Sequence, residues 1–196
     1  MNKIYIQPVV EDVLQEKVLQ KLFQHLRNDI ELYPAIGKKG NSYILERLAS
    51  FNEASIEECR YFVLLDMDKP YCIVDFLQER VNFTPKPYFS LRVCVLEVET
   101  WLLADRQNFA KFLGVTDTII PVNVEEKISQ PKEFVISLAQ QSKKKEIKTI
   151  IPEGTAKQGK GYNIQMLSFV ENLWDFQNAS KNCKSLQKTI QKIKNF

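Results

Sequence analysis

Histidine is nearly absent from this chain of 196 residues, in which His25 is the single example. A zinc site built from histidines, an HNH-type nuclease centre, and Ser-His or Cys-His catalysis with several essential histidines are therefore all hard to build. His25 lies inside an amphipathic helical pattern, and we interpret it as a surface or boundary residue. If the chain is an enzyme, its acid–base groups must be carboxylates, lysines or metal-bound water.

Paired cysteines and long apolar runs are also missing. The four cysteines form no CxxC pair, which argues against a zinc knuckle, a thioredoxin-type motif and a disulfide framework. No segment approaches the run of about 20 apolar residues that a bilayer span needs. The apolar start is interrupted by polar residues too early for a signal peptide. We therefore expect a cytoplasmic protein that does not associate with a membrane.

Charge is distributed unevenly along the chain, although the net charge is only +3. Many acidic residues fall in the first two thirds, whereas the last third is rich in lysine. An acidic site beside a basic surface suits a polyanion that lysines hold while metal-bound carboxylates act on it. A solvated basic helix end explains the same charge pattern more simply. The lysines that we consider for phosphate binding are Lys157, Lys160, Lys184, Lys188 and Lys192.

The order of apolar patterns predicts an α/β fold with a mainly parallel sheet flanked by helices. A strand is expected over residues 4–10, and the apolar residues from Leu14 to Leu26 then recur at helical spacing. Residues 61–66 form a continuous apolar run, which is typical of a strand buried on both faces. Residues 88–99 are predicted to form a further strand.

The remaining segments predict a turn and a helical extension. The sequence GKKGN (37–41) is interpreted as a turn, after which Asn41 or Ser42 is expected to cap a helix. Up to Gly114 the pattern alternates between strands and helices, and after Gly114 it predicts several helices. We expect an α/β core over residues 1–110 and a helical, lysine-rich extension over residues 111–196, packed as one body.

Three of the expected strands finish in acidic residues: Glu11 follows the first, Asp66 and Asp68 the second, and Glu97 and Glu99 the third. Because the carboxyl ends of parallel strands share one edge of a sheet, these acids are expected to converge. Mg²⁺ prefers oxygen ligands and is commonly held by a few carboxylates and substrate phosphate. We therefore predict that Glu11, Asp66 and Asp68 hold Mg²⁺ or Mn²⁺, with Glu97 or Glu99 as an additional acid for a second ion.

Each of these acids also has a purely structural explanation. Asp68 could cap the helix entered at Pro70, an effect of about 1 kcal/mol, and Glu11 precedes a helix, where acids are common. Glu99 and Asp105 could be a helix cap and a surface charge. Spacing alone leaves both interpretations open.

The order Glu11, helix, Asp66-x-Asp68, helix and strand resembles the Toprim domain of topoisomerases, primases, OLD-type nucleases and the small ribosomal-RNA maturase. The segments EVETWLLAD (97–105) and NLWDFQNASKNCKSLQKTI (172–190) are similar to one subgroup of short bacterial Toprim-like proteins. Genes of this subgroup often neighbour an ATPase of the AAA or ABC type in anti-phage cassettes. The resemblance implies that Asp66 and Asp68 hold Mg²⁺ and that Glu11 is a general acid or base, or a metal ligand.

One residue departs from the family pattern. The family motif runs Glu-Gly, whereas Asp12 follows Glu11 here and either narrows the site or adds an acid. The length leaves no room for the tyrosine domain of a topoisomerase or the zinc module of a primase.

The resemblance and the acids together predict a Mg²⁺-dependent nuclease of the Toprim type that hydrolyses phosphodiester bonds of DNA or RNA. By the resemblance, it is the effector of an anti-phage defence system under the control of an ATPase partner. Two alternatives stay open: a nuclease that processes one structured RNA, and a non-catalytic adaptor or regulatory subunit of an ATPase.

Overall fold

The computed structural model describes residues 3–67 and 72–196. It divides into two compact units: the first comprises the chain up to Val95 together with Lys188–Phe196, and the second is Leu96–Gln187. The sheet ends before Val95 and the helices that follow belong to the second unit, whereas we expected the core to reach residue 110. The end of the predicted extension also returns to the first unit.

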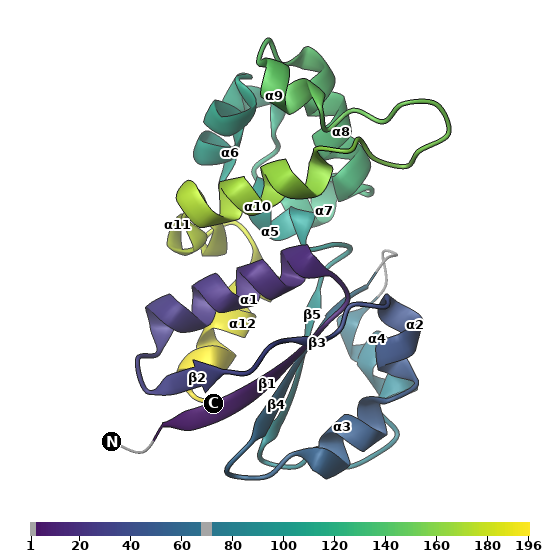
Figure 1. Ribbon diagram of the computed structural model, residues 1–196, viewed down its shortest axis with the longest axis vertical. Helices are drawn as coiled ribbons and strands as arrows, with labels where there is room; N and C mark the ends of the chain where they lie inside the picture. Colours follow the sequence, from purple (N-terminus) through teal and green to yellow (C-terminus); the bar gives the residue numbers. More distant parts are fainter. Residues whose placement is uncertain (1–2, 68–71) are drawn as a thin grey trace. The chain divides into compact units, whose positions relative to one another are not determined.

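The first unit is built on a sheet in which every described strand pairing is parallel (Figure 1). The strand order is β2-β1-β4-β5, and β3 pairs with β1. This arrangement confirms the predicted α/β fold. The strands are β1 (Ile4–Val10), β2 (Ile30–Leu32), β3 (Ile36–Gly37), β4 (Arg60–Asp66) and β5 (Phe89–Cys94).

Helices cover both faces of this sheet, with α1 and α12 on one face and α2, α3 and α4 on the other (Figure 1). Side chains alternate across a strand, so β4 needs apolar residues at successive positions to be buried on both sides. The Phe62 ring contacts the rings of Phe23 and Phe196, whereas Val63 lies in a cluster with Ile44. The helices are α1 (Val13–Leu26), α2 (Asn41–Leu45), α3 (Leu48–Ala54), α4 (Ile73–Arg80) and α12 (Lys184–Lys194).

The helices of the second unit surround a core of large aromatic side chains. Trp101 and Trp174 are almost fully buried, and the Trp174 indole N–H donates to the Trp101 carbonyl oxygen at 3.2 Å. Pro131 occupies the first turn of a helix, where its missing N–H costs no hydrogen bond. The elements are α5 (Glu99–Leu103), α6 (Arg106–Leu113), a 3₁₀ turn (Asp117–Ile119), α7 (Val124–Lys127), α8 (Pro131–Gln141), α9 (Lys145–Lys148), α10 (Tyr162–Asn172), α11 (Phe176–Ser180) and the first turn of α12.

The strand predicted over residues 88–99 is shorter than expected. It ends at Cys94, and Leu96 adopts a φ of 66°, a left-handed conformation that is uncommon for a residue other than glycine. The chain leaves the sheet at this point, and α5 begins at Glu99. Glu97 and Glu99 therefore do not end a strand of the sheet, and both belong to the second unit.

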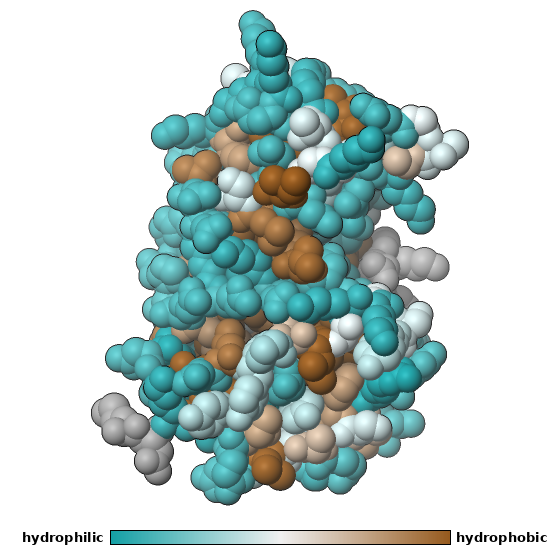
Figure 2. All heavy atoms as spheres, viewed as in Figure 1, coloured by the Kyte–Doolittle hydropathy of each residue, from teal (hydrophilic) through white to brown (hydrophobic). Residues whose placement is uncertain are grey.

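Hydrophilic side chains predominate on the face of the molecule that Figure 2 shows. Within residues 3–67 and 72–196, no helix combines the length and the apolar character that crossing a bilayer requires.

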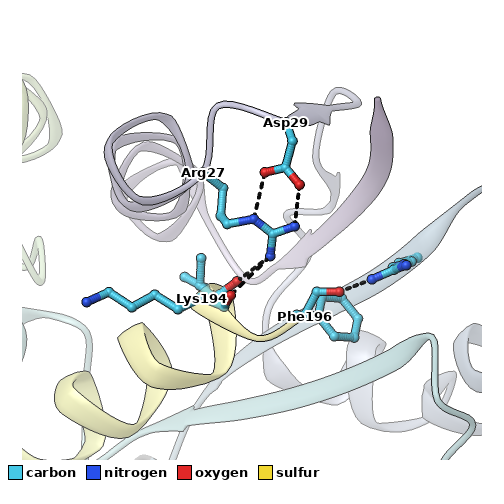
Figure 3. Close-up of polar contacts among 6 residues, drawn as sticks. Arg27, Asp29, Lys194 and Phe196 are labelled. Atoms are coloured by element: carbon cyan, nitrogen blue, oxygen red, sulfur yellow. Dashed lines mark hydrogen bonds and ion pairs between the residues drawn. The ribbon is translucent and has the colours of Figure 1, made fainter. Parts of the chain in front are cut away.

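The carboxyl end of α12 is held in the first unit by two arginines (Figure 3). Arg27 donates to the main-chain oxygens of Ile193 at 3.1 Å and Lys194 at 3.4 Å. The same guanidinium makes two bonds of 2.7 Å to the carboxylate of Asp29, and Arg60 donates to the main-chain oxygen of Phe196. The last carbonyl groups of a helix have no partner within the helix, so Arg27 satisfies two of those of α12, and Arg60 holds Phe196, which lies beyond it.

Replacing this charged donor should destabilise the protein. We expect Arg27→Ala to lower the free energy of unfolding by about 1–3 kcal/mol, because charged hydrogen bonds at a half-buried site are lost. Urea denaturation followed by circular dichroism measures the change. Lys3→Ala is the control, since it removes only the exposed pair with Glu31 and should leave the midpoint unchanged. Equal midpoints for Arg27→Ala and the unaltered protein would contradict the expectation.

Candidate functional site

Two of the predicted acids, Glu11 and Asp66, meet at the carboxyl edge of the sheet in the first unit. Strands β1 and β4 are parallel neighbours with Val9 opposite Val63, so both strands end at the same edge of the sheet. A carboxylate oxygen of Glu11, Oε1, accepts a hydrogen bond of 2.6 Å from the main-chain N–H of Asp66. Two acids 55 positions apart in the chain are thereby in contact.

Asn41 joins the ends of the two strands. Its Nδ2 donates to the main-chain oxygen of Asp66 at 2.7 Å and to Glu11 Oε1 at 3.3 Å. The predicted capping role of Asn41 or Ser42 is wrong, because Gly40 occupies the cap position and no side chain caps α2. Asn41 instead fixes the positions of both acids, a role for which the sequence carries no local signal.

The loop Gly37–Asn41, which we call the site loop, is bonded to the carboxyl end of β1. The main-chain N–H of Lys38 donates to the Val10 oxygen at 2.7 Å, and that of Gly40 to the Glu11 oxygen at 3.4 Å. Gly37 has a φ of 98°, and a Cβ at this position would overlap the carbonyl oxygen of Val10. The segment interpreted as a turn is thus part of the site, and its glycine permits this close approach.

The start of α1 also orients Glu11. The Glu11 N–H donates to Gln15 Oε1 at 2.9 Å, and Gln15 is fully buried. Asp12 accepts bonds of 2.9 Å at Oδ1 from the main-chain N–H groups of Leu14 and Gln15. Its φ of −151° is ordinary extended backbone. Asp12 is therefore the N-cap of α1, a position that its short carboxylate suits.

The described acids suit a hard divalent cation but do not form a complete cage. Mg²⁺ is commonly bound through one or two carboxylates, with water and substrate phosphate completing the shell. Glu11 and Asp66 are the described acids that could contribute to such a site, whereas Asp68 lies outside the described residues. In the part of the chain that the structure describes, no three His, Cys, Asp or Glu side chains gather into a candidate metal site.

Glu97 and Glu99 contact polar partners within the second unit. Glu97 Oε2 accepts a bond of 2.8 Å from the main-chain N–H of Lys132, in the first turn of α8, where an acid is favourable. Glu99 is 2% exposed, accepts a bond of 2.7 Å from the Tyr162 hydroxyl and lies 3.7 Å from Lys132 Nζ. Burial raises the pKa of the Glu99 carboxyl; Lys132 opposes this shift and Glu97 adds to it. Their role with a second metal ion stays a prediction.

Asp105 is buried, so its interpretation as a surface charge is wrong. Its carboxylate accepts bonds of 2.8–2.9 Å from Asn108 Nδ2, Asn178 Nδ2 and the main-chain N–H of Asp175. The Trp101 indole N–H likewise donates to the Ser185 hydroxyl at 2.7 Å. The segments 97–105 and 172–190 therefore contact each other through several hydrogen bonds.

The lysines predicted to bind phosphate differ in their surroundings. Lys192 is half-buried, with Nζ 4.8 Å from the Phe196 ring centroid, and burial lowers its pKa, as do the nearby charges of Arg92 and Arg60. Lys160 is exposed between Gly159 and Gly161, and a Cβ on either glycine would overlap atoms of the segment 149–151. Close backbone packing therefore explains these glycines. Lys157, Lys184 and Lys188 are exposed.

The buried carboxyl group of Glu99 should make stability depend on pH. Its pKa is raised in the folded protein, so the unfolded chain releases the proton first and stability falls as pH rises above about 4.3. Relative to Glu99→Gln, the unaltered protein should lose unfolding free energy between pH 5 and pH 7.5. Urea denaturation of both proteins at both pH values measures this difference. A difference that does not change with pH would refute a raised pKa.

Comparisons with protein-family models, characterised proteins and solved structures find no match to this chain. Its Toprim-like resemblance therefore stays a prediction from the motifs. What the structure establishes is an α/β unit in which Glu11 and Asp66 contact each other where two parallel strands end.

Proposed function

We propose that the protein is a Mg²⁺-dependent phosphodiesterase that cleaves DNA or RNA, with Glu11, Asp66 and Asp68 as its acids. The observation that carries this proposal is the contact of the Glu11 carboxylate with Asp66 at the carboxyl edge of a parallel sheet. Sites in open α/β sheets form at this edge. The near absence of histidine also directs the proposal toward carboxylate and metal chemistry.

The residues around Glu11 suit a carboxylate that must keep one orientation. The main-chain N–H of Asp66 and the Asn41 amide both donate to Oε1, and Gln15 accepts from the Glu11 main chain. An acid held in this way can accept a proton or bind a cation without first reorganising. When bound, Mg²⁺ or Mn²⁺ would lower the pKa of a water ligand and so supply the nucleophile. Glu11 and Asp66 would hold the ion together with Asp68.

The sequence resemblance extends this proposal to a biological setting. Proteins of the subgroup that the chain resembles are encoded beside AAA or ABC-type ATPases, so we place the nuclease under the control of such a partner in anti-phage defence. Restraint by a partner suits an enzyme that would otherwise cleave the nucleic acids of its own cell.

Cleavage assays test the role of the acids. Plasmid, linear DNA and tRNA are each incubated with the protein in Mg²⁺ or Mn²⁺. Glu11→Gln and Asp66→Asn preserve side-chain size but remove charge, and each should lower the cleavage rate at least about 100-fold. Glu58→Gln alters an exposed acid ahead of β4 and should have no effect. Equal cleavage by the unaltered protein and Asp66→Asn would indicate a contaminant and refute the proposal.

The same assay separates the alternatives. A single cut in one structured RNA, with DNA untouched, would favour the processing nuclease. Titration calorimetry with Mn²⁺ addresses the adaptor: we expect heat of binding for the unaltered protein and its loss in Asp66→Asn. An unaltered protein that neither binds Mn²⁺ nor cleaves would favour the non-catalytic adaptor.

A further inference from the structure

A cluster of two cations around one aromatic ring stands next to the acids of the first unit. Lys39 Nζ lies 5.1 Å from the centroid of the Tyr43 ring, and the guanidinium carbon of Arg47 lies 4.0 Å from the same centroid. We call Lys39, Tyr43 and Arg47 the basic–aromatic cluster. Its residues come from the site loop, from α2 and from the residue that precedes α3.

The site loop places this cluster beside Glu11. Lys39 stands between Lys38 and Gly40, whose main-chain N–H groups bond to the last oxygens of β1 and to Glu11. Two residues further on, Asn41 contacts both Glu11 and Asp66. A polymer that contacts Lys39 therefore contacts the same loop that is hydrogen-bonded to Glu11, one of the proposed metal-binding acids.

The charge of the cluster is poorly neutralised by the protein. Lys39 is exposed and makes no ion pair with any described residue. Arg47 approaches Glu46 at 3.2 Å, but both side chains are exposed, at 42% and 70%, and such pairs contribute little. Lys38 differs, because its 2.7 Å ion pair is with Glu16, whose side chain is only 18% exposed. The cluster thus presents positive charge to solvent, whereas the charge of the neighbouring Lys38 is paired with a carboxylate.

The ring gives this charge a fixed position. Tyr43 packs against the buried cluster that includes Val9, Ile44 and Leu48, so the core of the unit supports it. Cations are attracted to the face of an aromatic ring, and Lys39 and Arg47 both approach the ring of Tyr43. One guanidinium nitrogen of Arg47 also donates to the Tyr43 carbonyl oxygen at 3.2 Å. Guanidinium groups are well suited to phosphate oxygens, which they can bind in a bidentate manner.

We propose that the basic–aromatic cluster binds the phosphodiester backbone of the nucleic acid and guides it to Glu11 and Asp66. This inference rests on the proposed function and deepens it, because it assigns substrate contact to the basic–aromatic cluster and not to the lysines predicted in the C-terminal region.

Fluorescence anisotropy tests this assignment. Labelled single-stranded DNA and RNA oligonucleotides of equal length are titrated at several salt concentrations in EDTA, so that no cleavage occurs. Each lost phosphate contact should reduce the slope of log affinity against log salt by about 0.7 for a single strand. Lys39→Ala/Arg47→Ala should therefore reduce the slope by about 1.4 and weaken binding at low salt at least about tenfold.

A matched double variant serves as control. Lys157→Ala/Lys160→Ala removes two exposed lysines of the second unit and should leave the slope unchanged. Tyr43→Phe keeps the aromatic ring and should bind like the unaltered protein. Tyr43→Leu keeps an apolar side chain but removes the ring that Lys39 and Arg47 approach, so it should bind more weakly. Circular dichroism confirms that each variant is folded.

Three outcomes would overturn the inference: an unchanged slope in Lys39→Ala/Arg47→Ala, a reduced slope in Lys157→Ala/Lys160→Ala alone, or no binding of either probe by the unaltered protein. The result is distinguishable from failure of the proposed function, since binding is measured without a divalent ion. A protein that binds through the cluster but cleaves nothing refutes the phosphodiesterase alone. One that cleaves with an unchanged slope refutes the cluster alone.

Discussion

The parallel pairing of β1 with β4 is the constraint on which the candidate site depends. Because Val9 lies opposite Val63, both strands end at one edge, and a single hydrogen bond of 2.6 Å joins Glu11 to Asp66. A shift of one residue would turn every buried side chain of a strand to the opposite face. The apolar residues of β4 pack against helices on both faces, so the core itself opposes such a shift. The geometry of the acids is thus a consequence of hydrophobic packing.

Much of this arrangement could be predicted from local pattern. The apolar run before Asp66 and the helical spacing after Glu11 are strong signals, and parallel strands then bring the acids together. The bridge made by Asn41 could not be predicted, since Asn before an apolar run is most simply a helix cap. Here a contact across the sheet prevails over the local rule. The boundary of β5 was missed for a related reason, because the left-handed backbone of Leu96 has no signature in residue type.

Asp105 shows the same limit in the second unit. Its partners Asp175 and Asn178 lie 70 and 73 positions away in the chain, so no local pattern indicates that this carboxylate is buried. A buried polar group is costly unless it is hydrogen-bonded, which ties the identities of these residues to one another. The segments 97–105 and 172–190 are therefore joined by structural hydrogen bonds. The chemistry proposed for the protein rests on Glu11 and Asp66, in the other unit.

The discontinuity of the first unit affects the order in which the protein can be completed on the ribosome. A nascent chain emerges amino end first, and all of Leu96–Gln187 is translated before Lys188–Phe196 rejoins the sheet. Until then, Phe62 lacks the ring of Phe196, and Arg27 lacks the main-chain oxygens that it later binds. Domains generally fold as units during synthesis. The second unit is thus the earlier of the two to have its whole sequence available, and the half that carries Glu11 is the last to close.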